Sequence, residues 1–142
     1  MRLKNKVAIV TGAASGFGEG IARRFAQEGA SVVVADINYS NAQKVTSEIK
    51  AEGGKAEALN VDVSDNLQTK NMFDNTIKLF GKLDILIQNA AIGMKPTPFA
   101  ETSEDEFDTL FKINVKSVYL GAFHGIPIFR KQGHGGVIIN TI

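Results

Sequence analysis

Residues 11–18 read TGAASGFG and place three glycines between a short apolar run and a helical pattern. The run VAIV at residues 7–10 has the β-branched character of a buried strand, and the segment after the glycines has apolar residues at helical spacing. A glycine turn that leads from a strand into a helix presents free N–H groups and the positive end of the helix dipole. The chemistry that suits such a turn is the binding of a pyrophosphate group.

The spacing of these glycines is Gly12-x-x-x-Gly16-x-Gly18. It differs from the G-x-G-x-x-G pattern, because Ala14 and Ile21 stand where that pattern has glycine. A Cβ atom at Gly12, Gly16 or Gly18 would hold a phosphate away from the backbone or would clash within the turn. The alternative is a tight turn that only packs the helix on the strand.

Asp36 ends the second strand pattern, SVVVAD at residues 31–36. It lies about twenty residues after the glycine turn, where dinucleotide-binding folds place an acid on the adenosine ribose. A carboxylate accepts hydrogen bonds from ribose hydroxyls but repels a 2′-phosphate, and neither Ile37 nor Asn38 supplies a compensating cation. The pattern therefore predicts NAD rather than NADP; the alternative for Asp36 alone is a turn residue at the end of a strand.

Strand and helix patterns alternate along the rest of the chain. The strand patterns lie at residues 7–10, 31–36, 55–61, 83–88 and 137–140, and the helical patterns at residues 19–30, 40–52, 64–80 and from 103 past 122. Such alternation predicts right-handed crossovers and a parallel sheet that is covered on both faces. We expect a doubly wound α/β domain of the Rossmann type over residues 1–142, with its first five strands.

Composition excludes several classes of protein. A net charge of +1 over 142 residues argues against a nucleic-acid binder. No apolar run reaches the length of about 18 residues that spans a bilayer, so we expect a cytoplasmic protein with no membrane partner. With no cysteine and only two histidines, a metal site is not expected.

Four motifs in order resemble those of the short-chain dehydrogenase/reductase family. The turn at 11–18 is similar to its TGxxxGxG motif, and Asp62 and Val63 resemble its adenine-contacting Asp-Val pair. QNAA at 88–91 resembles its NNAG motif, and Asn114 matches the asparagine of its catalytic tetrad. The resemblance covers the whole chain.

Two residues depart from the family pattern, Gln88 in place of asparagine and Ala91 in place of glycine. Asn89 is kept, and the resemblance implies that it steadies the centre of the sheet beside the cofactor. The residues expected to bind NAD are Gly12, Ser15, Gly16, Phe17, Gly18, Asp36, Ile37, Asp62, Val63, Asn89, Ala90 and Ala91.

The resemblance also implies an activity, the interconversion of a small-molecule alcohol and a carbonyl compound by hydride transfer to or from nicotinamide. It implies that Asn114 is catalytic, interrupting the hydrogen bonding of its helix and holding a water in a proton relay. The alternative for Asn114 is a buried polar side chain that is bonded to nearby backbone.

The family's remaining catalytic groups are a serine after the fifth strand and a Tyr-x-x-x-Lys motif. Tyr39 is followed four residues later by Gln43 and Tyr119 by Phe123, so neither makes the motif. We expect these residues to be the N-terminal part of a protein of about 250 residues, inactive alone. The alternative is a noncatalytic module that binds a dinucleotide.

Further candidates follow the fourth strand. The family's substrate loop begins at Lys95, Pro96 and Phe99, which are therefore candidates for substrate contact, whereas His124 and His134 are expected to have no catalytic role. One face of the last helix carries an apolar stripe of Phe107, Phe111, Val115 and Val118. The stripe could pack on the sheet, could form the dimers or tetramers that the family suggests, or could do both.

Overall fold

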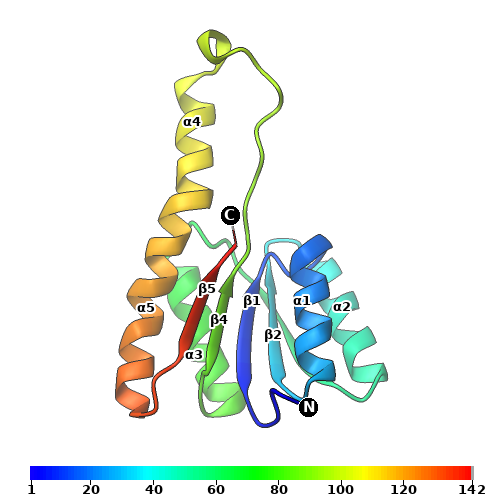
Figure 1. The fold of residues 1–142 in the computed structure, drawn as a ribbon. Coiled ribbons are helices and arrows are strands. Elements are labelled where there is room, and N and C mark those ends of the chain that lie inside the picture. Colours follow the sequence, from blue (N-terminus) through cyan, green and yellow to red (C-terminus); the bar gives the residue numbers. More distant parts are fainter. Residues whose placement is uncertain (142) are drawn as a thin grey trace.

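Five parallel strands form one sheet in the computed structural model, which describes residues 1–141 (Figure 1). Their order is β3-β2-β1-β4-β5, so the chain starts in the centre, builds outward to one edge and then crosses to the other side of β1. The strands are β1 Val7–Thr11, β2 Ser31–Asp36, β3 Lys55–Asn60, β4 Ile85–Gln88 and β5 Val137–Asn140. The predicted parallel, doubly wound sheet is confirmed.

Helices cover both faces of this sheet (Figure 1). They are α1 Gly16–Gln27, α2 Tyr39–Ala51, α3 Asn66–Phe80, α4 Glu104–Phe111 and α5 Ser117–Gln132, with a short 3₁₀ helix η1 at Phe99–Glu101 and a π-helix η2 at Lys112–Lys116. On one face, Ala22 of α1 and Ile49 of α2 pack on Val34. On the other, Phe73 of α3 and Phe129 of α5 pack on Leu86.

Helix starts follow the sequence signals. The side chain of Asp65 accepts a hydrogen bond from the Gln68 N–H at the start of α3, so Asp65, one of the two predicted candidates, is the cap. At the start of α4, Ser103 and Glu106 form a reciprocal capping box. These caps fix where the chain leaves the carboxyl ends of the strands.

A buried carboxylate holds the opposite end of the sheet together. Asp84 is 5% exposed and accepts hydrogen bonds from the Val7 N–H at 2.9 Å and from Lys6 Nζ at 3.4 Å. Burial acts to raise the pKa of Asp84, but the Val7 bond and the charges of Lys82 and Lys6 outweigh it and lower the pKa. The ionised side chain thereby ties β1 to the segment that enters β4.

The long helical pattern is confirmed past residue 122, and the local interruption expected at Asn114 is present. The helix runs through Pro127 to Gln132 and contains a π turn, η2, in its middle. The stripe of exposed side chains continues from Val115 to Tyr119 and Phe123, whereas Val118 is half-buried. An i, i+4 spacing drifts by about 40° per repeat on a regular α-helix, and the wider π turn offsets part of this drift.

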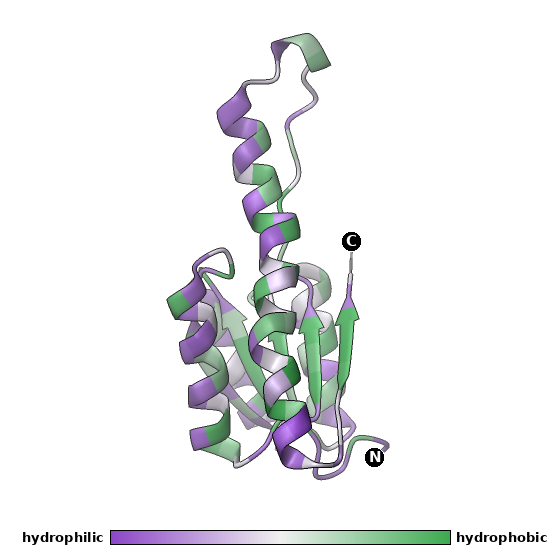
Figure 2. Ribbon diagram, turned by 90° about the vertical axis from the view of Figure 1, so that its left-hand side faces the viewer, coloured by the Kyte–Doolittle hydropathy of each residue, from purple (hydrophilic) through white to green (hydrophobic). Residues whose placement is uncertain are grey.

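The N-terminal part of this long helix projects from the molecule. Helix α4 extends beyond the carboxyl ends of the strands and buries none of its residues within the described part of the chain (Figure 1). Apolar and polar segments alternate along α4 and α5 (Figure 2). Core packing therefore does not account for Phe107 and Phe111, which are 56% and 52% exposed.

Candidate functional site

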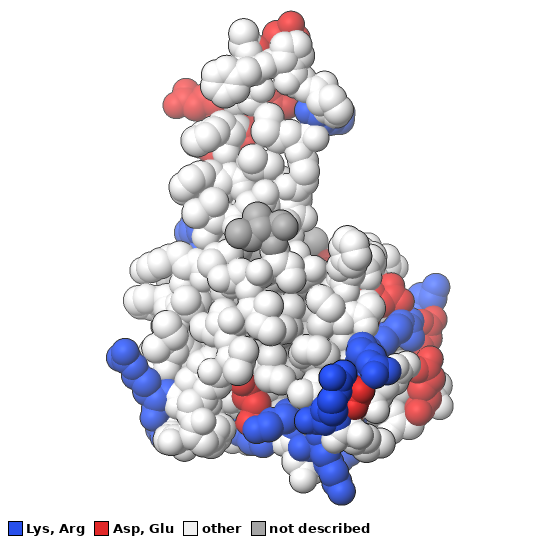
Figure 3. Space-filling model, in the orientation of Figure 1, with Lys and Arg blue, Asp and Glu red and all other residues white. Residues whose placement is uncertain are grey.

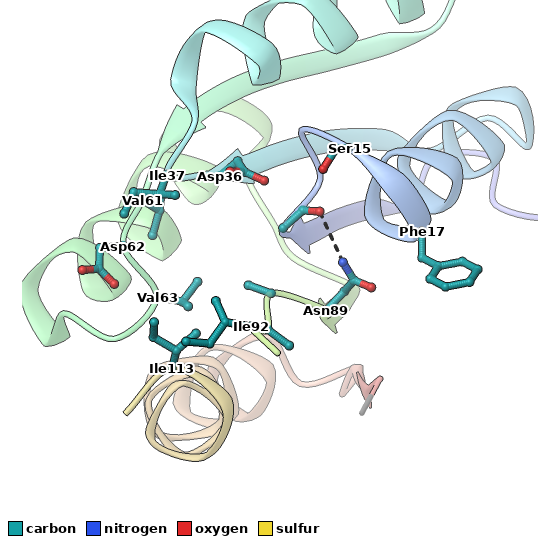
Figure 4. A pocket seen from close by; sticks show the side chains of 13 residues that line it. Ser15, Phe17, Asp36, Ile37, Val61, Asp62, Val63, Asn89, Ile92 and Ile113 are labelled. Atoms are coloured by element: carbon teal, nitrogen blue, oxygen red, sulfur yellow. Dashed lines mark hydrogen bonds between the residues drawn. The ribbon is translucent and has the colours of Figure 1, made fainter. Parts of the chain in front are cut away.

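A cavity of about 420 Å³ opens at the carboxyl ends of the strands (Figure 4). It lies beside the boundary between β1 and β4, where the chain reverses its direction of winding, the position at which open α/β sheets bind ligands. Its walls are Gly12, Ser15, Phe17, Asp36, Ile37, Val61, Asp62, Val63, Asn89, Ala90, Ala91, Ile92 and Ile113. All the residues predicted to bind a cofactor line it except Gly16 and Gly18.

The glycine turn fits closely against the end of β4. Gly12 has a φ of 63°, and a Cβ atom there would lie 2.8 Å from Ala90 Cα. Asn89 Nδ2 donates to the carbonyl of Thr11 at 3.1 Å and to that of Gly12 at 3.3 Å, the latter drawn in Figure 4. The Thr11 hydroxyl accepts from the Asn89 and Ala90 N–H groups. Asn89 thus joins the two central strands at the cavity.

Gly18 serves the packing of the turn. A Cβ atom on Gly18 would lie 2.1 Å from the Gly12 carbonyl oxygen and 2.6 Å from Asn89 Nδ2. Such distances are far below van der Waals contact, so any side chain would push α1 away from the turn. Of the two reasons that the sequence offers for glycine, a clash within the turn is the one that applies at Gly18.

The start of α1 faces this site without a side-chain cap. Ser15 stands at the N-cap with extended backbone, and its side chain makes no capping hydrogen bond within residues 1–141. The first-turn N–H groups of a helix have no intrahelical acceptor, and together with the dipole they attract anions. The ring of Phe17 is 89% exposed and points away from Asp36 and Asp62 (Figure 4).

Two carboxylates stand on the other side of the cavity, Asp36 at the end of β2 and Asp62 two residues after β3. Asp36 Oδ2 accepts from the Ala14 N–H at 3.0 Å and Oδ1 from the Asn38 N–H at 2.8 Å. Asp62 Oδ1 accepts from the Ser64 hydroxyl at 2.7 Å and from the Ser64 N–H at 2.9 Å. These bonds lower the pKa of Asp62, and the positive charges of nearby lysines lower it further.

Three apolar wall residues were not among those predicted: Val61, Ile92 and Ile113. Val61 directly precedes the predicted Asp62 and Val63, and Ile92 directly follows Ala91, so both could have been found by extending the motifs. Ile113 belongs to the π-helix, and no spacing in the sequence indicates that it reaches the cavity. Together with Ile37 and Val63, these residues give the cavity an apolar wall opposite the glycine turn (Figure 4).

Asn114 lies in the π turn and reaches back to the chain that leaves β4. Its Oδ1 accepts from the Ile92 N–H and its Nδ2 donates to the Ile92 carbonyl, both at 2.9 Å. The regular i to i−4 hydrogen bonding of the helix is interrupted here, as expected. The side chain is bonded to backbone, as in the alternative interpretation, but it is half-buried rather than buried, and it holds a residue that lines the cavity.

A second cavity, of about 350 Å³, lies between the segment after β4 and helix α4. Lys95 lines it, whereas Pro96 and Phe99 do not, and Phe99 is 94% exposed.

His124 bonds to Asn66 outside either cavity. Within residues 1–141, no group of three His, Cys, Asp or Glu residues could hold a metal ion. No helix in the same part of the chain is long and apolar enough to cross a membrane.

Comparison with known proteins identifies the family of this chain. A family model described as short chain dehydrogenase matches residues 6–142, so the chain belongs to the short-chain dehydrogenase family. It is 44% identical over 141 residues to 4-formylbenzenesulfonate dehydrogenase TsaC1/TsaC2 of Comamonas testosteroni, covering 99% of this chain and 56% of that protein. It is 37% identical over 139 residues to 3beta-hydroxysteroid dehydrogenase 2 of Eggerthella lenta, covering 98% and 54% respectively.

The fold is shared with a solved relative that contains a dinucleotide. The crystal structure of 3-ketoacyl-(acyl-carrier-protein) reductase from Brucella melitensis complexed with NADH matches with a TM-score of 0.92 and 41% identity. The match covers 97% of this chain and 57% of that one. The chain thus spans about half the length of the oxidoreductases that it matches, and some relatives bind a nicotinamide dinucleotide.

Proposed function

We propose that the cavity at the carboxyl ends of the strands binds NAD(H), in a protein that interconverts an alcohol and a ketone. One observation carries the proposal. The glycine turn, the uncapped start of α1 and the carboxylate of Asp36 all border one cavity at the reversal point of the sheet. Each has the chemistry that one part of a dinucleotide requires.

The residues present fit such a cofactor. The first-turn N–H groups of α1 would hold the pyrophosphate. Gly12 and Ala13 have no large side chain that would keep the phosphates away from the turn. Asp36 would accept from the adenosine ribose, and the apolar wall near Asp62 would take the adenine. When bound, the cofactor supplies or accepts the hydride at its nicotinamide ring. The small side chains of Ala90 and Ala91 would leave room for that ring.

The charges of the cavity favour NAD over NADP. Asp36 and Asp62 both border it, and no lysine or arginine lines it among the described residues. The lowered pKa of Asp62 keeps that group ionised at neutral pH. A 2′-phosphate would enter a negative region without a partner, and uncompensated like charges cost several kcal/mol.

Titration with NADH and NADPH, followed by their fluorescence, tests this proposal. We expect NADH to bind at least about tenfold more tightly, since the difference is set by charge repulsion. Asp36→Ala is expected to weaken NADH binding and to shift the ratio toward NADPH. Equal loss of both ligands would contradict the assignment of the ribose to Asp36, and no binding of either would refute the cofactor proposal.

We also propose that Asn114 takes part in catalysis by holding Ile92 and the interrupted helix beside the reacting groups. In the complete polypeptide, Asn114→Ala is expected to leave NADH affinity nearly unchanged and to lower kcat by about a hundredfold, the scale that a misplacement of about 1 Å costs. Lys131→Ala, an exposed change in the last turn of α5, is the control. Wild-type turnover by Asn114→Ala would remove Asn114 from the mechanism.

Residues 1–142 contain no Tyr-x-x-x-Lys sequence. We therefore propose that these residues alone bind the dinucleotide without turnover, which is the behaviour of the noncatalytic module considered above. A complete polypeptide that supplies the tyrosine and lysine would convert the same cavity into an active site. Single-turnover assays on residues 1–142 and on the complete polypeptide distinguish the two.

A further inference from the structure

The glycine turn is held on its β2 side as well as on its β4 side. The β1–β2 ladder reaches Thr11 and Ala35. Beyond it, the Ala13 N–H donates to the Ala35 carbonyl at 3.3 Å, and the Ala14 N–H donates to Asp36 Oδ2 at 3.0 Å. The carboxylate therefore continues the ladder by one bond into the turn, where the β2 backbone supplies no further acceptor.

The second oxygen of Asp36 has a fixed partner too. Oδ1 accepts from the Asn38 N–H at 2.8 Å, and the Asn38 side chain in turn caps α2 by accepting from the Asn41 N–H. One half-buried carboxylate thus connects the turn before α1 to the turn before α2. Hydrogen bonds to an ionised acceptor are stronger than those between neutral groups, so this connection is stiff.

We infer that Asp36 is a positioning residue for the pyrophosphate-binding turn: its carboxylate holds the Ala14 N–H, and with it the entry to α1, in the binding conformation before any ligand arrives. The inference rests on the proposed function, because it takes the turn as the pyrophosphate site. It goes beyond the role of Asp36 toward the ribose, since it assigns to the same side chain an effect on the binding of the pyrophosphate.

Electrostatics and positioning predict opposite results for a ligand that has no ribose. Asp36 is negative, so removing it would strengthen the binding of an anion at the turn if its charge were its only influence. If Asp36 positions the turn, its removal frees the Ala14 N–H and the entry to α1 to move, and the anion binds more weakly. Inorganic pyrophosphate is the probe, because it cannot contact Asp36 as a ribose does.

The first measurement is amide hydrogen exchange of the ligand-free protein by NMR. In Asp36→Ala, exchange at Ala14 is expected to be faster by at least about tenfold, the loss of one charge-assisted hydrogen bond. Asp62→Ala is the matched control, because Asp62 borders the same cavity and bears the same charge but bonds to Ser64. Unchanged exchange at Ala14 in Asp36→Ala would overturn the inference.

The second measurement is the affinity for inorganic pyrophosphate by isothermal titration. Asp36→Ala is expected to bind it at least about threefold more weakly than wild type, whereas Asp62→Ala binds it equally or more tightly. Equal or tighter binding by Asp36→Ala would overturn the inference. If wild type binds no pyrophosphate, the proposed function fails at this turn, and the exchange result alone decides whether Asp36 positions it.

Asp36→Asn provides a variant of the same shape if Asp36→Ala does not fold. Its single carbonyl oxygen can accept from Ala14 or from Asn38, while its NH₂ group faces the other donor. One of the two amides is then expected to exchange faster and pyrophosphate binding to fall by an intermediate factor. Wild-type exchange at both amides would contradict the inference.

Discussion

At the scale of the residue, Gly18 and Gly20 of α1 differ in their surroundings. The glycine turn packs against Gly18, whereas the space beside Gly20 is open. A Cβ atom at Gly18 meets the Gly12 carbonyl at 2.1 Å, whereas one at Gly20 meets nothing within 4 Å. Gly18→Ala is expected to lower the free energy of unfolding by about 1–3 kcal/mol through overpacking. Gly20→Ala, the control, should raise it by about 0.5–1 kcal/mol, because alanine favours a helix.

Urea unfolding of both variants makes this comparison, and NADH titration extends it to the site. Because Gly18 also abuts Asn89 Nδ2, Gly18→Ala is expected to weaken NADH binding, while Gly20→Ala leaves it unchanged. Equal stability of the two variants would mean that the turn adapts to a side chain at Gly18.

Residue types and spacing predicted that the glycine turn and Asp36 belong to one site, and the family resemblance added Asp62, Val63 and residues 89–91. The glycine turn and Asp36 each belong to one strand end, and parallel strands bring their carboxyl ends to one edge. The sequence could not indicate that Asp36 bonds to Ala14 or that Asn114 bonds to Ile92. Those contacts join segments that are distant along the chain. They depend on strand register and on how closely a turn approaches the neighbouring strand.

At the scale of the element, the fold was predictable and the long helix was less so. Alternating strand and helix patterns predicted the parallel sheet, and the capping residues predicted the starts of α3 and α4 within a residue or two. Among the described residues, helix α1 has no side-chain cap, and it spans Gly16–Gln27, three residues before the predicted pattern at 19–30. The π turn at Lys112–Lys116 follows from no propensity of its residues. It brings Ile113 to the cavity and helps to keep the exposed apolar side chains on one face of the long helix. Both outcomes depend on tertiary contacts.

The junction between α3 and α5 predicts a dependence of stability on pH. His124 Nε2 lies 2.8 Å from Asn66 Oδ1. Burial, together with the charge of Lys70, lowers its pKa below the ordinary value of 6.5, while Asp74 acts to raise it. The unfolded chain therefore takes up a proton at higher pH than the folded protein, and the free energy of unfolding falls as pH drops below about 6.5.

Urea unfolding at about pH 7.5 and about pH 5.5, on either side of the ordinary histidine pKa, tests this dependence. The fall in stability is expected to be smaller in His124→Gln than in wild type. His134→Gln is the control, because it removes the other histidine, which is exposed in the turn after α5. An equal fall in wild type and His124→Gln would show that other groups cause it.

At the scale of the whole molecule, uncharged surface covers much of the face drawn in Figure 3, and the charged side chains gather toward its ends. Along α4, η2 and α5 the exposed apolar side chains recur every fourth residue: Phe107, Phe111, Val115, Tyr119 and Phe123. Contiguous apolar surface of this kind marks an interface. We propose that a second copy of the complete protein covers it, giving a homo-oligomer.

Sedimentation equilibrium of the complete protein tests this association. Phe111→Glu places a charge at the centre of the stripe and is expected to weaken self-association by at least about thirtyfold, the scale of an interface hot spot. Leu79→Glu on α3, where Leu79 is 48% exposed, is the control and is expected to leave the mass unchanged. A wild-type mass for Phe111→Glu would refute the interface. Because Phe111 is not buried within residues 1–141, a loss of stability without dissociation would show that another part of the same polypeptide covers the stripe.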